Sequence, residues 1–219
     1  NFQRVNLSAV DERFSPHDAR FFLLEQLVQA HPFWEAVFMV DAFDVRVGMN
    51  PCLSLEEDVL YIGDEQFASI RGGGQVTLRH SWLGEKFERT GGAPWEWYKN
   101  LADETKGSMA QLNCGVIGGR RGAILRFLRR VREEMLGLDL SQATERASKV
   151  SWDNGFVKMV KGVRSMATGM WAFFGSLFGA SEEPARLGPQ TQFDMPVTNY
   201  VVHTDFRGRF HSGEPGNSK

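Results

Sequence analysis

Apolar residues in the stretch "SPHDARFFLLEQLVQAH" (15–31) recur every three or four positions, which matches the 3.6-residue turn of an α-helix. Ser15 is a favourable capping residue, and Pro16 suits the first helical turn. A short link leads to the apolar run "AVFMV" at 36–40, whose length and composition predict a buried strand. A helix joined so closely to a buried strand indicates an α/β protein.

The same order of elements returns between residues 112 and 136. A predicted strand at 112–117 runs into Gly118 and Gly119, and a helix over 121–136 follows. The apolar positions of this helix keep to one face. Four arginines fall outside it and are expected to be solvated or to meet a neighbouring element. These arginines are Arg126, Arg129, Arg130 and Arg132.

Weaker patterns occupy the rest of the chain, where alternating apolar positions predict strands and aromatic-rich or capped stretches predict helices. The remaining predicted elements are short strands at 58–63, 75–80 and 208–210 and short helices at 93–102 and 195–203. Asp194 precedes the last of these helices and is expected to cap it.

Residues 137–192 carry the least regular pattern, and we expect an insertion or a lid-like segment there. Within it, residues 156–180 place basic side chains ahead of a dense apolar patch. Glycines interrupt that patch, and it is too short to span a bilayer. Two interpretations stay open: an interfacial or lid helix that contacts a membrane surface or another protein, and a core helix under the sheet.

Composition supports one folded domain over 1–219, because 42% of the residues are hydrophobic. The net charge of -2 argues against a nucleic-acid-binding protein, which usually carries a basic excess. Cys52 and Cys114 are too few for a disulfide scaffold; we expect two unpaired thiols, with a bond between them as the alternative. The chain does not begin with Met, and we expect it to be a piece of a longer protein.

Two aspartates end the apolar run at 36–40: Asp41 follows it directly, and Asp44 comes three positions later. Residues three apart on a strand point to opposite faces, so these side chains converge only if the strand ends and the chain turns. Ligands bind beyond the carboxyl ends of strands in open α/β sheets. The pair is therefore either a set of solvated acids at a strand end or a site for a hard divalent cation.

Five stretches in a fixed order give the chain a family resemblance: "VFMVDAFDV" after a helix, then "NP", "NCGVIGG", "DMPVTNYVVHT" and "HSGEPGNSK". Together they resemble the GT-A-fold glycosyltransferases, a class of nucleotide-diphospho-sugar transferases. The resemblance covers most of the chain from Phe14 onward, except residues 137–192. It implies an α/β fold with a GT-A-like three-layer sandwich around a mainly parallel sheet.

The resemblance also implies roles for particular residues. A Mn²⁺ or Mg²⁺ cofactor would be held by Asp41, Asp44 and His211, and other residues would line a donor-sugar pocket or approach the diphosphate. The positions that match these substrate-binding roles are Asn113, Cys114, Gly115, Gly118, Gly119, Asp194 and Lys219. Plain structural interpretations stay open beside these roles: Asn113 as a strand end, Asp194 as a helix cap and His211 as a packed histidine.

The implied activity is metal-dependent transfer of a sugar from a UDP- or GDP-linked donor to a hydroxyl of a glycan or glycoprotein acceptor. In an inverting enzyme, Asp194 or Glu214 would act as the catalytic base. In a retaining enzyme, which is slightly favoured, Asp194 would position or stabilise the sugar instead. The implied location is the Golgi or secretory lumen in a eukaryote and the cytoplasm otherwise.

The start of the chain departs from the family pattern. A βαβ unit takes about 30 residues or more, and the 40 residues before Asp41 leave room for one helix and the end of one strand. Either the first βαβ unit is missing from this chain or the domain is degenerate. The alternative function is a non-catalytic carbohydrate-binding or assembly module that kept the fold, which the apolar patch at 166–178 also favours.

Overall fold

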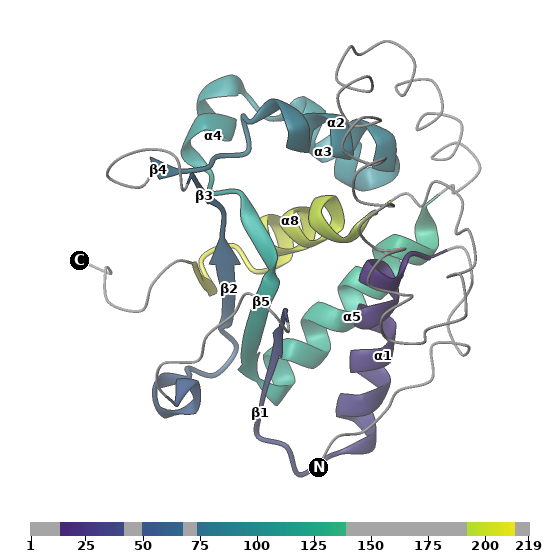
Figure 1. Ribbon diagram of the computed structural model, residues 1–219, viewed down its shortest axis with the longest axis vertical. Coiled ribbons are helices and arrows are strands. Elements are labelled where there is room, and N and C mark those ends of the chain that lie inside the picture. Colours follow the sequence, from purple (N-terminus) through teal and green to yellow (C-terminus); the bar gives the residue numbers. More distant parts are fainter. Residues whose placement is uncertain (1–13, 42–49, 68–73, 139–191, 213–219) are drawn as a thin grey trace, which may run out of the picture.

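The computed structural model describes residues 14–41, 50–67, 74–138 and 192–212 (Figure 1). The predicted insertion at 137–192 falls almost wholly outside these ranges, as does the apolar segment 156–180. Among the helices of the described residues, none is both long enough and apolar enough to cross a membrane.

The described chain contains both helices and strands, and three successive strands (β2 to β4) are followed by three successive helices (α2 to α4). The helices are α1 (Pro16–Ala30), α2 (Ser81–Thr90), α3 (Gly92–Asn100), α4 (Asp103–Ser108), α5 (Arg121–Gly137) and α8 (Asp194–Asp205), with a 3₁₀ turn at Pro51–Ser54. The strands are β1 (Ala36–Val40), β2 (Leu60–Asp64), β3 (Gln66–Phe67), β4 (Gly74–Gln75), β5 (Leu112–Arg120) and β6 (Phe210–Ser212). The α/β class is confirmed.

Four strands form the main sheet in the order β1-β5-β2-β6. β5 runs antiparallel to both β1 and β2, and β6 lies parallel to β2. The expectation of a mainly parallel sheet is therefore wrong for the described strands. The chain leaves β2 and re-enters the sheet at the same end, where the Glu65 N–H donates to the Gln111 carbonyl at 2.9 Å. β5 therefore runs antiparallel to β2.

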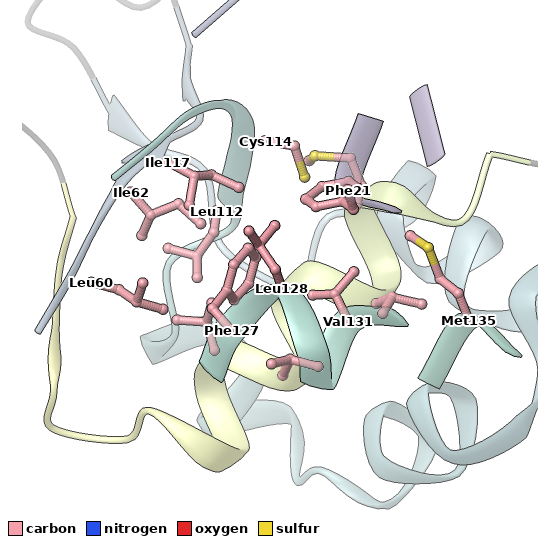
Figure 2. Close-up of a cluster of buried hydrophobic side chains, with 14 of the residues drawn as sticks. Phe21, Leu60, Ile62, Leu112, Cys114, Ile117, Phe127, Leu128, Val131 and Met135 are labelled. Atoms are coloured by element: carbon pink, nitrogen blue, oxygen red, sulfur yellow. The ribbon is translucent and has the colours of Figure 1, made fainter. Parts of the chain in front are cut away.

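Helices α5 and α8 pack against β5 and against each other, and α1 lies along α5 (Figure 1). Helices α2 and α3 pack on α8. Between α5 and the sheet lies one apolar core (Figure 2), to which strands and helices both contribute. Its members include Phe21, Leu60, Ile62, Leu112, Cys114, Ile117, Phe127, Leu128, Val131 and Met135. Burial of each large side chain contributes about 1.5–3 kcal/mol, so this core fixes the positions of α1, α5 and α8 relative to the sheet.

Helix α1 begins where the sequence predicts, because Ser15 and Asp18 form a capping box. Helix α8 begins differently. Asp194 is its first helical residue, Phe193 occupies the N-cap position, and no side chain caps the helix there. The expected capping role of Asp194 is wrong, and its carboxylate is left to other partners.

The segment predicted as a strand at 75–80 is mostly not one. Regular pairing stops at Gln75, and Thr77 makes an isolated bridge to Ala110. The chain turns at Leu78 and Arg79, where the His80 N–H donates to the Thr77 carbonyl at 3.1 Å and the Tyr98 hydroxyl donates to the Leu78 carbonyl at 2.9 Å. The α2 helix then begins, which the sequence pattern did not predict; α4 was missed as well.

Candidate functional site

The candidate site lies where the carboxyl end of β1 meets the starts of α1 and α8. Asp41 directly follows β1, and its backbone N–H donates to the Gly115 carbonyl at 2.8 Å, which extends the pairing with β5 by one residue. Helix α1 precedes β1 and runs in the opposite direction, so its first turns lie at the same end of the sheet as Asp41. Arg20 stands on the second turn of α1.

Arg20 connects two of the carboxylates that the sequence singled out. Its Nη1 donates to Asp41 Oδ1 at 2.9 Å, and its Nη2 donates to Asp194 Oδ2 at 3.2 Å. The Arg20 side chain is 22% exposed, against 45% for Asp41 and 9% for Asp194. One planar guanidinium therefore joins a half-exposed carboxylate to a buried one, in contacts that are charge-assisted.

The Asp194 carboxylate is only half satisfied. Its Oδ1 is buried and has no hydrogen-bond partner within the described part of the chain, while Oδ2 accepts from Arg20. A buried polar atom without a partner costs about 1–3 kcal/mol, so such an atom is a good position for a ligand hydroxyl or a water molecule. The start of α8 also favours a negative charge there.

Asp18 fastens the start of α8 to α1. Its Oδ1 accepts from the Phe193 backbone N–H at 2.9 Å, while its Oδ2 accepts from the backbone N–H and the hydroxyl of Ser15. Burial, together with the nearby charge of Asp194, raises the pKa of the Asp18 carboxyl to about 6 despite these hydrogen bonds. Asp18 and Arg20 thus hold two adjacent residues at the start of α8, the N-cap Phe193 and the first helical residue Asp194.

Asn113 and Asp41 converge over Gly115. A Cβ atom at Gly115 would lie 2.7 Å from Asn113 Oδ1 and 2.8 Å from Asp41 Oδ2, so the missing side chain leaves the space these oxygens use. The Asn113 amide nitrogen donates to Glu65 Oε1 at 2.7 Å. Glycine is thus needed here to admit two side chains of the protein itself, whereas the resemblance implies that Gly115 lines a donor-sugar pocket.

Cys114 points the other way, into the core shown in Figure 2. Its side chain is 2% exposed, and burial raises the pKa of the thiol, with Asp194 as a further cause. A ligand at the site could meet the backbone of Cys114 but not its sulfur. Cys52 and Cys114 are both free, which confirms the expectation of unpaired thiols.

Gly118 and Gly119 lie further along β5, away from Asp41. Gly118 is paired with Phe38 and Tyr61, and a Cβ there would fall 2.0 Å from the Phe38 ring. Gly119 has a φ of +155°, and a Cβ there would lie 2.8 Å from the Val59 carbonyl oxygen. Both glycines allow close packing within the sheet, so the structure does not bring them to the candidate site.

His211 is also separated from Asp41. It lies on β6, at the opposite edge of the sheet from β1, with two strands between, so roughly 14 Å of sheet intervenes at the usual strand spacing. Its Nε2 lies 3.0 Å from Glu56 Oε1, and its ring lies 5.3 Å from that of Tyr61. The two predicted metal ligands are not brought together, because β5 and β2 enter the sheet between them.

Three predicted site residues lie outside the described residues: Asp44, Glu214 and Lys219. Among the described residues, no group of three or more His, Cys, Asp or Glu side chains could hold a metal ion. The oxygens that are present nevertheless have the right chemistry for a hard cation. Asp41 Oδ2 borders the space left by the missing side chain of Gly115. Asp41 would be one carboxylate ligand, and the other ligands would come from outside the described residues.

Arg20, Asp18 and Glu65 were not identified from the sequence. For Arg20 a signal was present, since a cation in the first turns of a helix opposes the helix dipole and needs another reason to be there. Asp18 lies in the first turn of the predicted helix, and nothing in the sequence marks it as a contact to α8. Glu65 follows β2 without any distinctive pattern.

Comparison with protein-family models, with curated proteins and with solved structures found no match for the chain.

Proposed function

We propose that this protein is a metal-dependent glycosyltransferase with a GT-A-like fold, which moves a sugar from a nucleotide-diphosphate donor to an acceptor hydroxyl. One observation carries the proposal. Asp41, Asn113 and Asp194 come from three distant parts of the chain and each matches the family pattern, and they gather around Arg20 and Gly115 at one end of the sheet.

Each residue has a role in this proposal. Asp41, with Asp44, would hold Mn²⁺ or Mg²⁺, which when bound supplies charge neutralisation for the departing nucleotide diphosphate. Asn113 and the backbone at Gly115 would border the donor. Asp194 would contact the sugar, and Lys219 would approach the diphosphate. His211 is left out of the metal site because the sheet separates it from Asp41.

The surroundings of Asp194 favour a retaining enzyme over an inverting one. Arg20 holds Oδ2 and fixes the carboxylate, so the partnerless Oδ1 is suited to accept a hydrogen bond from a sugar hydroxyl. A catalytic base must receive a proton from the acceptor, whereas Asp194 Oδ2 is already held by Arg20. Glu214 is the other predicted base of an inverting enzyme.

Calorimetric titration with UDP and GDP, with and without Mn²⁺, tests the proposal. We expect binding that requires Mn²⁺ and is lost in Asp41→Asn. Asp58→Asn is the matched control, since Asp58 pairs with Arg126 ahead of β2, at the other end of that strand. Nucleotide binding that is equally strong without metal and unchanged in Asp41→Asn would contradict the proposal.

The second candidate function is a carbohydrate-binding or assembly module without catalysis. The observation that favours it is the ion pair between Arg20 and Asp41, in which the charge of Asp41 is neutralised by the protein's own side chain and needs no metal ion. Such a module would bind a glycan without needing nucleotide or metal. Glycan binding that is unaffected by chelator, together with no release of nucleotide diphosphate from UDP- or GDP-sugars, would favour this alternative.

A further inference from the structure

The end of the sheet at which β1 and β2 begin carries exposed apolar side chains (lower part of Figure 1). Phe33, in the turn between α1 and β1, is 94% exposed, and Leu53, in the 3₁₀ turn ahead of β2, is 84% exposed. These are the two most exposed large apolar side chains among the described residues. Trp34 is partly exposed beside Phe33, with its ring stacked on that of His31 at 4.3 Å. A single exposed apolar side chain is ordinary, whereas several on one surface mark a contact with another molecule.

An open cleft of about 390 Å³ joins the two turns. Its lining residues are Glu35, Glu57, Arg120, Arg121 and Gly122. Glu35 comes two residues after Phe33, and Glu57 comes four residues after Leu53, so both apolar turns adjoin the cleft. The surface thus combines apolar and charged side chains, as interfaces between proteins do.

Both turns are fixed to the rest of the fold. The Arg121 N–H at the start of α5 donates to the Glu35 carbonyl at 2.9 Å, which holds the turn that contains Phe33. The Tyr61 hydroxyl on β2 donates to the Ser54 carbonyl at 3.0 Å, which holds the turn that contains Leu53. A surface that is already held in place loses little conformational entropy when a partner binds to it.

The charges of the cleft are balanced in sign but loosely paired. Arg120 Nε lies 3.5 Å from Glu57 Oε1, and Arg120 Nη1 lies 3.9 Å from Glu35 Oε2, both beyond the usual length of a hydrogen bond. Both glutamate side chains are exposed, so their carboxylates can turn to another cation at little cost. A partner surface of one sign would be repelled by half of these charges. A second copy of the chain offers both signs.

We propose that this end of the sheet is an interface for a second copy of the chain, with the two copies related by a twofold axis. Each contact across such an interface occurs twice. Arg120 of each copy therefore meets Glu35 or Glu57 of the other, while Phe33 and Leu53 are removed from water. The candidate site lies at the opposite end of β1, so the interface leaves it open and goes beyond the proposed function.

Sedimentation velocity of the intact protein over a series of concentrations measures self-association, and we expect a reversible dimer. Phe33→Ser and Leu53→Ser should each weaken dimerisation about tenfold or more, as truncation does at the centre of an interface. Neither should lower the melting temperature, because both side chains are exposed. Leu136→Ser, which alters an exposed leucine at the far end of α5, is the matched control and should leave the dimer unchanged. A protein that stays monomeric throughout overturns the proposal, as does a dimer that Phe33→Ser and Leu53→Ser leave intact.

An exchange of charges tests the twofold pairing directly. Arg120→Glu should dimerise less than the parent, because it adds a third carboxylate to the cleft; it should still fold, since the start of α5 favours a negative charge. Glu57→Arg and Glu35→Arg should each dimerise less for the opposite reason. In an equal mixture of Arg120→Glu with the glutamate variant whose site Arg120 contacts, both contacts of a heterodimer join opposite charges, so dimerisation should return towards the parental level. If neither mixture dimerises more than its separate variants, the proposal is overturned.

Discussion

The glycines of β5 and β2 differ in what surrounds their missing side chains. At Gly115 the neighbours are the ends of two polar side chains, which can move. At Gly118 the neighbour is the face of the Phe38 ring, and at Gly63 all neighbours are at ordinary contact distances of 3.7–3.8 Å. The three positions therefore offer a matched set in which binding and stability respond differently to one added methyl group.

Gly115→Ala should weaken metal or nucleotide binding about tenfold or more, because displacing Asp41 and Asn113 by even 1 Å removes aligned ligand contacts. Its melting temperature should fall little. Gly118→Ala should instead lower the free energy of unfolding by about 1–3 kcal/mol, since the Phe38 ring must shift. Calorimetric titration and thermal melting of both variants check this, with Gly63→Ala as control. Loss of stability without loss of binding in Gly115→Ala would contradict the assignment.

Asp18 predicts a second effect at the residue scale. Its folded pKa of about 6 is above the ordinary value of 3.8, so the folded protein binds more protons than the unfolded chain between these values. This contribution to stability is full below about pH 4 and is lost as pH rises through about 6, on the order of 1–3 kcal/mol.

In Asp18→Asn this contribution should vanish, so the variant should gain stability relative to the parent between pH 4 and pH 7. Urea unfolding at both pH values measures the difference. Glu57→Gln, which alters a carboxylate that is 84% exposed, serves as control. A parent–variant difference that is the same at pH 4 and pH 7 would show that Asp18 does not titrate in this range.

At the scale of elements, the arginines of α5 act as links. Arg132 pairs with Glu25 of α1 at 2.7 Å, Arg130 with Asp205 of α8 at 2.6 Å, and Arg126 with Asp58 at 3.0 Å. The sequence left two interpretations of these charges open, solvated or facing a neighbour, and these three face neighbours. Their burial differs, however, and with it their expected contribution.

Arg132→Met should lower the free energy of unfolding by about 1–3 kcal/mol, because it leaves the buried Glu25 carboxylate without its cation. The Glu25 side chain is 6% exposed, whereas Arg126 and its partner Asp58 are both exposed. Arg126→Met should therefore cost less than about 1 kcal/mol. A double-mutant cycle with Glu25→Gln should recover part of the loss; simple additivity of the two losses would argue against coupling.

The fold was predictable from the sequence wherever one element carried its own signal. Helices α1 and α5 and strand β1 have strong apolar periodicity or apolar runs, and their bounds agree closely with the prediction. Strand direction carried no such signal, because alternation of helices and strands does not fix at which end of the sheet the chain returns. The stretch at 75–80 looked like a strand, but the chain turns after Thr77, where the His80 N–H donates to the Thr77 carbonyl, and α2 begins at Ser81.

The site was predictable to the same extent. The strand-end position gave Asp41, and the family resemblance gave Asn113 and Asp194. Their link, Arg20, depends on the approach of α1 to α8, which no local pattern encodes. His211 was placed with Asp41 by motif order alone, and the insertion of two strands between them could not be read from that order.

At the scale of the whole molecule, His203 adds a pH response opposite to that of Asp18. Burial lowers the pKa of the His203 imidazole, whose Nε2 lies 3.0 Å from the Ala110 carbonyl oxygen. A lowered folded pKa means that stability present above the unfolded value of about 6.5 is lost as pH falls. Between pH 4 and pH 7 the two buried groups therefore oppose each other.

His203→Gln should flatten the loss of stability on the acid side, so that the parent loses more free energy of unfolding between pH 7 and pH 5 than the variant does. Glutamine keeps a donor for the Ala110 carbonyl. Chemical denaturation across this range measures the effect, and His17→Gln, at an exposed position, is the control. Parallel profiles for parent and His203→Gln would contradict the prediction.

The contacts of Asp18 and Arg20 with Phe193 and Asp194 join residues 175 and 174 positions apart in the chain. During synthesis, β1 and β5 can pair long before α8 leaves the ribosome, whereas these contacts must wait for it. Closing so long a loop carries an entropic cost that is met only after local contacts have formed. The contacts of Asp18 and Arg20 with the start of α8 should thus form late, and a nascent chain halted before α8 would lack both these contacts and strand β6.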